Sequence, residues 1–161
     1  MKWRKVLLTL AILVAVAGVA GVTAVVLAYH EVTKIDRSNP KIVLDEYLRA
    51  ALVAKDEVGV DLYECAHPEK LSDLRAMRAD LDRRESEFNV QMLVSWGAMT
   101  SVDKSGTMEL GTSLTVTAME NGVVQGRQTE LWYFELIEDD GWRVCGATRS
   151  LTPAPAASAD S

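Results

Sequence analysis

The sequence has little of the residue types that most often carry chemistry. Its 161 residues include only two histidines and two cysteines, and 6% are aromatic. Two cysteines are too few for a small domain held together by several disulfides, and ten glycines with four prolines are too few for a fibrous chain. The sequence also has no glycine-rich phosphate loop and no metal-ligand spacing. We therefore predict no catalytic residue, no metal site and no cofactor.

Acidic residues are absent from the first 28 positions. This segment holds three of the seventeen bases, whereas the other 133 residues carry fourteen bases and twenty-three acids, a net charge of −9. An uncharged apolar run extends from Val6 to Ala28, and at about 1.5 Å per residue it is long enough to cross a hydrocarbon core of roughly 30 Å. Lys2, Arg4 and Lys5 precede it, which predicts a cytoplasmic N-terminus. The acidic remainder makes nucleic acid an unfavourable partner.

A cleaved signal peptide is the competing interpretation of this segment, because Val26-Leu27-Ala28 is similar to a cleavage site. Signal peptides have apolar cores of about 7–15 residues, and this run is longer, so we prefer an anchor. Both interpretations export the rest of the chain. The predicted divisions are a cytoplasmic stub (1–5), a transmembrane anchor in the cell membrane (6–28), a hinge (29–38), an extracytoplasmic domain (39–149) and a disordered tail (150–161).

Helical spacing of the apolar residues begins after the hinge. Asn39 is suited to cap a helix and Pro40 to its first turn. The pattern that follows predicts a helix of about 17 residues that is broken at Gly59. A short turn over 60–65 comes next, and Pro68 begins a second predicted helix. The inner face of that second helix consists of Leu71, Leu74, Met77 and Leu81.

From Phe88 onward the apolar period changes from 3.6 to 2, which is typical of strands with one buried face. Strands are predicted near 88–102, 107–119, 123–138 and 142–149. Asn121-Gly122 and Asp140-Gly141 favour hairpin turns, because both pairs tolerate positive φ. The predicted fold class is α+β: an N-terminal transmembrane helix, then two to three helices packed on a curved four-stranded antiparallel meander.

The register of the central hairpin has two solutions. A two-residue turn at Asn121-Gly122 puts Leu110 and Leu114 on the face of Tyr133. A three-residue loop, or a bulge at Gly126, puts them on the face of Trp132 instead. The sequence leaves both solutions open.

The two cysteines fall in the predicted exported part, where thiols tend to be oxidised. A two-residue turn at Asp140-Gly141 pairs Leu136 with Cys145, so Cys145 faces the helices. Cys65 lies between the two predicted helices. We predict a Cys65–Cys145 disulfide, with a free thiol as the minority alternative. A metal site would need more ligands than these two and His67 provide.

Helices followed by a meander behind one anchor resemble the nuclear-transport-factor-2-like (cystatin-like) superfamily, and more narrowly its membrane-anchored members in actinobacterial cell envelopes. The stretches that carry the resemblance are NPKIVLDEYLRAALVAKD, LYEC and DDGWRVCGA. The resemblance spans residues 39–149. It implies a sheet curved into a cone and a cysteine pair, and it implies no particular activity.

The two faces of the predicted sheet differ in character. Alternation places one set of apolar residues inside the cone as its lining: Phe88, Met92, Trp132 and Phe134. Glu130 shares the parity of Trp132 and points inward near the cone mouth. A second set lies on the opposite, outer face: Leu131, Tyr133, Ile137, Trp142 and Val144. An outer patch of that size is more than a solitary domain usually exposes, unless the tail or a loop covers it.

These features lead to one functional hypothesis with one alternative. The leading hypothesis is a single-pass, membrane-anchored module of the cell envelope that docks a protein partner or a second copy and performs no catalysis. The alternative is a carrier that binds a small apolar ligand or lipid in the cone between helices and sheet. An enzyme ranks third.

Overall fold

A computed structural model describes residues 35–66 and 69–150. The predicted anchor at 6–28, His30, His67 and the predicted tail beyond Ser150 lie outside the described residues. Among the residues that are described, none of the helices has the length and apolarity needed to cross a membrane. A compact unit begins at Asp36 and contains all the elements discussed below.

Three helices and one π-helical turn form the helical layer. These elements are α2 (Pro40–Leu48), the π-helical turn η1 (Arg49–Ala54), α3 (Glu57–Tyr63) and α4 (Ser72–Phe88). Asn39 caps α2 as predicted, and its Oδ1 accepts a hydrogen bond from the N–H of Lys41 at 2.9 Å. The second predicted helix begins at Ser72 rather than at Pro68.

The first helix ends earlier than its sequence pattern predicts. Lys55 adopts a left-handed conformation with φ 55°, and Asp56 then caps α3 by accepting the N–H of Val58. Gly59 lies inside α3 and breaks nothing. A Cβ at Gly59 would stand 3.1 Å from the Cβ of Ala50, so this glycine lets α3 approach η1 closely.

The sheet contains five strands rather than the predicted four. The strands are β1 (Gln91–Trp96), β2 (Thr100–Asp103), β3 (Thr107–Glu120), β4 (Val123–Glu138) and β5 (Trp142–Arg149). The predicted first strand is split, because Phe88 completes α4, Asn89 is left-handed, and residues 97–99 separate β1 from β2. Both short strands pair with β3, and the full order is β1-β3-β4-β5 with every pair antiparallel.

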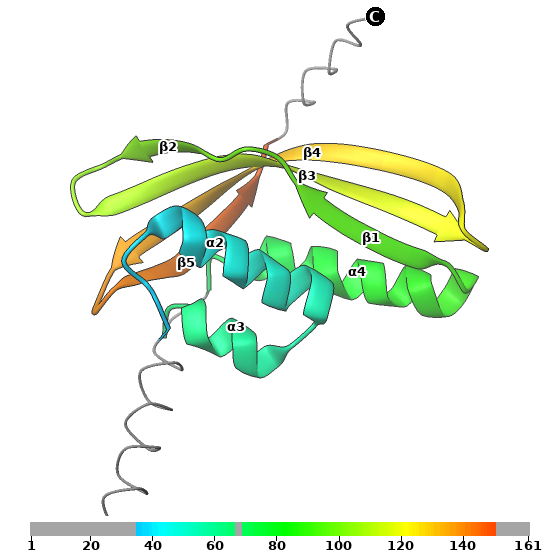
Figure 1. Ribbon diagram of the computed structural model, residues 1–161, viewed down its shortest axis with the longest axis horizontal. Coiled ribbons are helices and arrows are strands. Elements are labelled where there is room, and N and C mark those ends of the chain that lie inside the picture. Colours follow the sequence, from blue (N-terminus) through cyan, green and yellow to red (C-terminus); the bar gives the residue numbers. More distant parts are fainter. Residues whose placement is uncertain (1–34, 67–68, 151–161) are drawn as a thin grey trace, which may run out of the picture. The chain divides into compact units, whose positions relative to one another are not determined.

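All three helices lie on one face of the curled sheet, which bends over them (Figure 1). The fold is therefore α+β, with a concave face toward the helices and a convex face away from them. The core between the layers is built mainly from leucines and two aromatic rings. Its largest fully buried side chains are Trp132, Tyr47, Phe134, Leu44, Leu48, Leu71, Leu74, Leu110, Leu114 and Leu136.

The β3–β4 hairpin combines a two-residue turn with a bulge. Glu120 pairs with Val123 across Asn121-Gly122, and the register shifts between Ala118 and Met119. Of the two solutions open in the sequence, the bulge near Gly126 is the one adopted. It pairs Leu110 with Phe134, and both are fully buried on the concave face.

The register of the β4–β5 hairpin differs from the predicted one and changes which residues lie on the outer face. Its loop has three residues, since Glu138 rather than Asp139 pairs with Trp142, and the register shifts again between Glu135 and Leu136. Leu136 therefore opposes Val144, which is 0% exposed in the core, and Trp142 packs against the same core. The prediction that Trp142 and Val144 lie on the outer face is wrong, because the longer loop changes their parity.

The conformation of the loop at residues 139–141 explains why it has three residues rather than two. Asp140 and Gly141 both have positive φ, and a Cβ at Gly141 would lie 2.6 Å from the Cβ of Arg37. The carbonyl of Arg37 accepts the N–H of Trp142 at 2.9 Å. Arg37, near the N-terminus of the domain, thus packs against this turn. The sequence of residues 139–142 alone does not predict that contact.

We expect Val144→Asp to unfold the domain and Thr148→Asp to leave it folded. Both residues are on β5, but Val144 is buried whereas Thr148 is exposed. An unpaired buried carboxylate costs about 3 kcal/mol or more, and an exposed one costs little. Urea denaturation followed by circular dichroism measures both variants. A stable Val144→Asp variant would contradict the register.

Candidate functional site

A cavity of about 350 Å³ lies between α4 and the concave face of the sheet. The strands contribute an apolar floor, and α4 contributes the opposite wall through alternate turns. Amphipathic helices present residues three and four apart on one face, and Met77 and Leu81 of the predicted inner face belong to this wall, whereas Leu71 and Leu74 do not line the cavity. Its apolar lining is Met77, Leu81, Met92, Leu114, Val116 and Trp132.

Charged and polar side chains surround this apolar floor. Three acids and two bases line the cavity together with one amide: Asp73, Asp80, Glu130, Arg84, Arg149 and Gln128. Asp80 pairs with Arg83 and Arg84, and the hydrogen bond from Arg83 lowers the pKa of the Asp80 carboxyl. Glu130 accepts hydrogen bonds from Gln128 at 2.7 Å and Arg149 at 3.4 Å. Glu130 thus points inward as predicted, and it is paired with neighbouring side chains.

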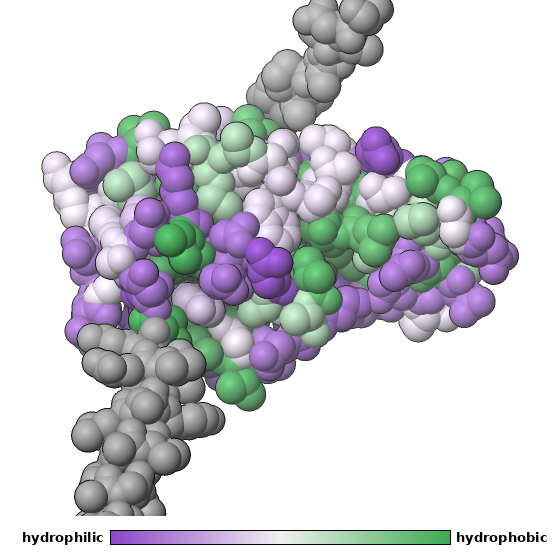
Figure 2. All heavy atoms as spheres, in the orientation of Figure 1, coloured by the Kyte–Doolittle hydropathy of each residue, from purple (hydrophilic) through white to green (hydrophobic). Residues whose placement is uncertain are grey.

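A second depression continues the cavity toward the tip of the β3–β4 hairpin. Its volume is about 430 Å³, and it shares Arg84 and Met92 with the cavity while adding Phe88, Val90 and Ala118. Apolar side chains gather over β1 and the tip of this hairpin in Figure 2. The concave side therefore offers a continuous, mainly apolar groove along α4.

The predicted cone lining is brought together only in part. Met92 and Trp132 line the cavity. Phe134 is fully buried beside it, and its ring stacks on that of Trp132 with centroids 6.3 Å apart. Phe88 is not inside, because it belongs to the last turn of α4 and is 61% exposed at the far end of the groove.

On the convex face, three of the five predicted residues remain. Tyr133 is 40% exposed and Ile137 is 37% exposed, while Leu131 is half-buried. The ring of Tyr133 lies over Gly111, where a Cβ would stand 3.2 Å from it. The apolar part of this face is therefore narrower than the sequence predicts.

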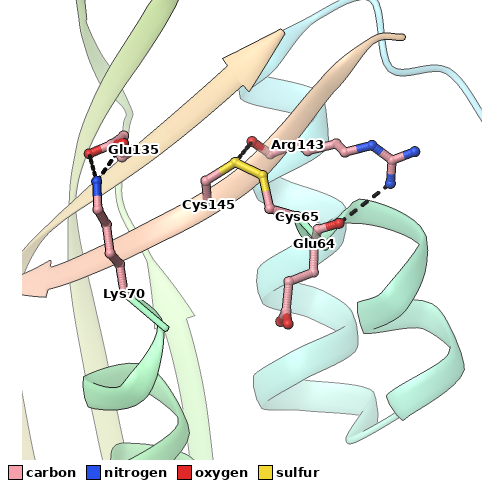
Figure 3. Close-up of a disulfide and its surroundings, with 6 residues drawn as sticks. All are labelled: Glu64, Cys65, Lys70, Glu135, Arg143 and Cys145. Atoms are coloured by element: carbon pink, nitrogen blue, oxygen red, sulfur yellow. Dashed lines mark hydrogen bonds and ion pairs between the residues drawn. A yellow bond between two sulfur atoms is a disulfide. The ribbon is translucent and has the colours of Figure 1, made fainter. Parts of the chain in front are cut away.

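The predicted disulfide joins Cys65 and Cys145, with Cα atoms 5.0 Å apart. Cys145 is the extra residue at the β5 bulge, and Cys65 follows Glu64, the residue that caps the end of α3 (Figure 3). The N–H of Cys65 donates to the carbonyl of Val144 at 3.0 Å, and the guanidinium of Arg143 donates to the carbonyl of Glu64 at 3.4 Å. Backbone, side chain and covalent bond thus attach this connection to β5 together.

A buried polar cluster of Tyr47, Glu64 and Arg75 lies beside the disulfide, and the sequence did not predict it. The hydroxyl of Tyr47 donates to Oε2 of Glu64 at 3.3 Å, and Arg75 pairs with the other carboxylate oxygen. Glu64 is 7% exposed and Tyr47 is 1% exposed. Burial raises the pKa of the Tyr47 phenol far above its ordinary value, so the phenol stays protonated and serves as a donor. Tyr47 follows helical spacing, but nothing local indicates its partner 17 positions away.

This cluster links α2, the connection after α3, and α4. Its members satisfy one another, as buried polar groups must. The adjoining depression, also about 350 Å³, is lined by Asp61, Glu57 and Arg78 as well. We interpret the cluster as part of the structure that holds the helices in place. Among residues 35–66 and 69–150, the acids, cysteines and histidines form no group able to hold a metal ion.

We expect reduction of the disulfide, or Cys145→Ser, to lower the free energy of unfolding by about 2–5 kcal/mol. The bond closes a loop between positions 80 apart, so its loss frees a long segment of the unfolded chain. Urea midpoints with and without dithiothreitol measure the effect. Thr148→Ser, at an exposed position of the same strand and outside the bridge, serves as the matched substitution. Equal midpoints under both conditions would contradict a structural role for the bond.

Comparisons with known proteins return no match to a family model, to a curated protein or to a solved structure.

Proposed function

We propose that the domain is a non-catalytic carrier that holds a small apolar or amphipathic ligand in the cavity between α4 and the concave face. The observation that carries this proposal is the volume left open there. Ligand cavities usually measure about 300–1,000 Å³, and this one measures about 350 Å³ before the adjoining groove is included. With Phe88 outside, aromatic side chains do not fill the space.

The lining supports an amphipathic ligand rather than a purely polar one. Leucine, valine, methionine and indole groups form the floor, and charges of both signs stand around it. An apolar chain buried on that floor gains about 25 cal/mol for each Å² removed from water. The Nε1 of Trp132 is buried and has no acceptor among the described residues. A ligand with a hydrogen-bond acceptor near its apolar part would satisfy this donor.

The proposed setting is the outer side of a cell membrane. The apolar run at 6–28 with its preceding bases supports an anchor whose C-terminal domain lies outside the cytoplasm. A disulfide within the domain agrees with an oxidising compartment. The resemblance to the membrane-anchored nuclear-transport-factor-2-like proteins agrees with the curled sheet, and we retain it as part of this proposal.

We expect Val116→Phe to weaken binding of the apolar probe N-phenyl-1-naphthylamine about tenfold, which corresponds to roughly 1.4 kcal/mol. Val116 is half-buried on the cavity floor, so a phenyl ring there occupies ligand volume. Thr117→Phe is the matched control, because Thr117 is the next residue and faces the convex side. Fluorescence titration of the full chain in a detergent that does not itself bind the probe gives both affinities.

Two outcomes of that titration would contradict the carrier. One is a wild-type chain that does not bind the probe. The other is equal weakening by both phenylalanine variants, which would place the probe elsewhere. Native mass spectrometry of the chain purified from membranes complements the titration, since a retained lipid would identify the ligand class directly.

Docking of a protein partner or a second copy through the convex face is the second candidate. Tyr133 favours it, because a large ring with a polar edge is a frequent anchor at interfaces, and this ring is 40% exposed. The remaining apolar neighbours are Leu131 and Ile137. An enzyme remains the third possibility, since the polar clusters among the described residues are paired internally.

If the convex face docks a second copy, Tyr133→Asp should abolish association and leave the fold intact. The position is exposed, so a charge there disturbs an interface rather than the core. Thr117→Asp on the same face, far along β3, is the control. Analytical ultracentrifugation with circular dichroism measures both properties. Unchanged association of a chain that does associate would exclude this face.

A further inference from the structure

The bases that line the cavity are already paired with acids of the same lining. On α4, the guanidinium of Arg84 lies 2.7 Å from the carboxylate of Asp80. On the sheet, Glu130 accepts hydrogen bonds from Gln128 at 2.7 Å and from Arg149 at 3.4 Å. Each of the two bases in the cavity therefore has a carboxylate beside it, and each pair belongs to one wall.

This pairing disfavours a ligand whose head group carries a net charge. An anionic head would compete with Asp80 or Glu130 for a guanidinium, in a lining that has three acids and two bases. Parting such a pair leaves one charge without its partner beside apolar surface, which is unfavourable. A cationic head meets the same obstacle at these two acids. The third acid, Asp73, is exposed, where an ion pair contributes little.

An uncharged head with hydroxyl groups suits the same lining. A hydroxyl both donates and accepts hydrogen bonds. It can therefore donate to a carboxylate oxygen of Glu130 and accept from the guanidinium of Arg149 without separating the two. That guanidinium has five N–H groups, more than its bond to Glu130 uses. The polar part of the cavity thus has hydrogen bonds to offer and no net charge to neutralise.

The groove that continues the cavity is mostly apolar. It shares Met92 with the cavity, and Phe88, Val90 and Ala118 extend it toward the tip of the β3–β4 hairpin. From Met77 in the cavity to Phe88 at the end of the groove, α4 advances by eleven positions, which is about 16 Å. An extended apolar chain that starts in the cavity would lie along this groove.

We infer that the ligand is an amphiphile with an apolar chain and an uncharged, hydroxyl-bearing head group, as in a monoacylglycerol. The head lies among the paired side chains of the cavity, and the chain follows the groove toward Phe88. The inference rests on the proposed carrier function and deepens it, because it names the class of ligand and the direction in which it lies.

Chain length tests the direction. Ala118 is half-buried in the groove and does not line the cavity, so Ala118→Phe fills the groove alone. We expect this variant to bind monododecanoylglycerol at least about tenfold more weakly, since each methylene kept out of an apolar site costs about fourfold in affinity. Monohexanoylglycerol has half the chain and should keep its affinity. Displacement of N-phenyl-1-naphthylamine from the full chain, corrected for each variant's own affinity for the probe, measures both ligands.

Phe88→Ser makes a second change in the groove that does not depend on core packing. The side chain is 61% exposed, so its loss leaves the fold intact, which circular dichroism checks. We expect weaker binding of the dodecanoyl ligand and unchanged binding of the hexanoyl ligand. Thr117→Phe on the convex side is the control and should affect neither. Each ligand also partitions into the detergent, but equally for every variant, so the variants are compared with one another.

The head group is tested by removing one acid from a pair. Glu130→Gln leaves the guanidinium of Arg149 without its carboxylate, so we expect binding of dodecanoate to strengthen about tenfold relative to monododecanoylglycerol. Glu138→Gln makes the same change in net charge at an exposed position outside the cavity and should not alter this ratio. A wild-type chain that prefers dodecanoate as strongly as the Glu130→Gln chain does would overturn the uncharged head.

The same titrations separate this inference from the carrier function. If the wild-type chain does not bind the naphthylamine probe, the proposed function itself fails. If it binds the probe and both acylglycerols, but Ala118→Phe and Phe88→Ser weaken the two chain lengths equally or not at all, the carrier stands and the direction of the ligand is overturned. An unchanged head-group preference in Glu130→Gln likewise overturns only the class of ligand.

Discussion

The attachment of the α3–α4 connection to β5 is the interaction on which the arrangement of the two layers depends. Cys65 donates its N–H to the carbonyl of Val144, the N–H of Ala147 donates to the carbonyl of Lys70, and the disulfide lies between these two bonds. Lys70 also pairs with Glu135 on the neighbouring strand (Figure 3). The connection thereby covers the outer edge of β5. It also positions α4 on the concave face, where α4 forms one wall of the cavity.

The bulge at Cys145 makes this attachment compatible with a well-packed core. An extra residue on one strand lets its neighbours keep their own faces while the bulged side chain is redirected. Val144 opposes Leu136 inside the core, and Gly146 opposes Glu135 one step beyond. A Cβ at Gly146 would lie 3.3 Å from the Cβ of Lys70, so the small residue admits the connection at close range. Packing and covalent closure are therefore achieved in the same short segment.

The unequal lengths of the strands determine where the cavity lies. β4 extends well past the end of β5, which pairs only with Trp132–Glu138, whereas β1 flanks β3 almost to the tip of the β3–β4 hairpin. Only α4 follows it, and the side chains of one helix do not fill the space under two long strands. The half of the sheet near Val116 and Gln128 accordingly retains an open volume.

Much of this architecture was predictable from the sequence, because it rests on local patterns. Alternation gave the three long strands to within a residue, the turn residues Asn121-Gly122 marked the central hairpin, and the inner face of α4 followed from helical spacing. The pairing of Cys65 with Cys145 was also predicted, since the sequence has only two cysteines and both fall in the part that was predicted to be exported. The placement of Met92 and Trp132 at the cavity needed no more than parity.

Features that depend on contacts between residues distant in the sequence were determined only by the tertiary structure. Arg37 packs against the turn at Gly141, and the resulting three-residue loop moved Trp142 and Val144 to the concave side. The left-handed residue Asn89 let Phe88 end a helix instead of beginning a strand. Glu64 joined Tyr47 and Arg75 only once three helices had come together. A single residue added to a loop reverses the parity of the positions between the loop and the next bulge, here residues 142–144. A local pattern does not contain the partner that determines the loop's length.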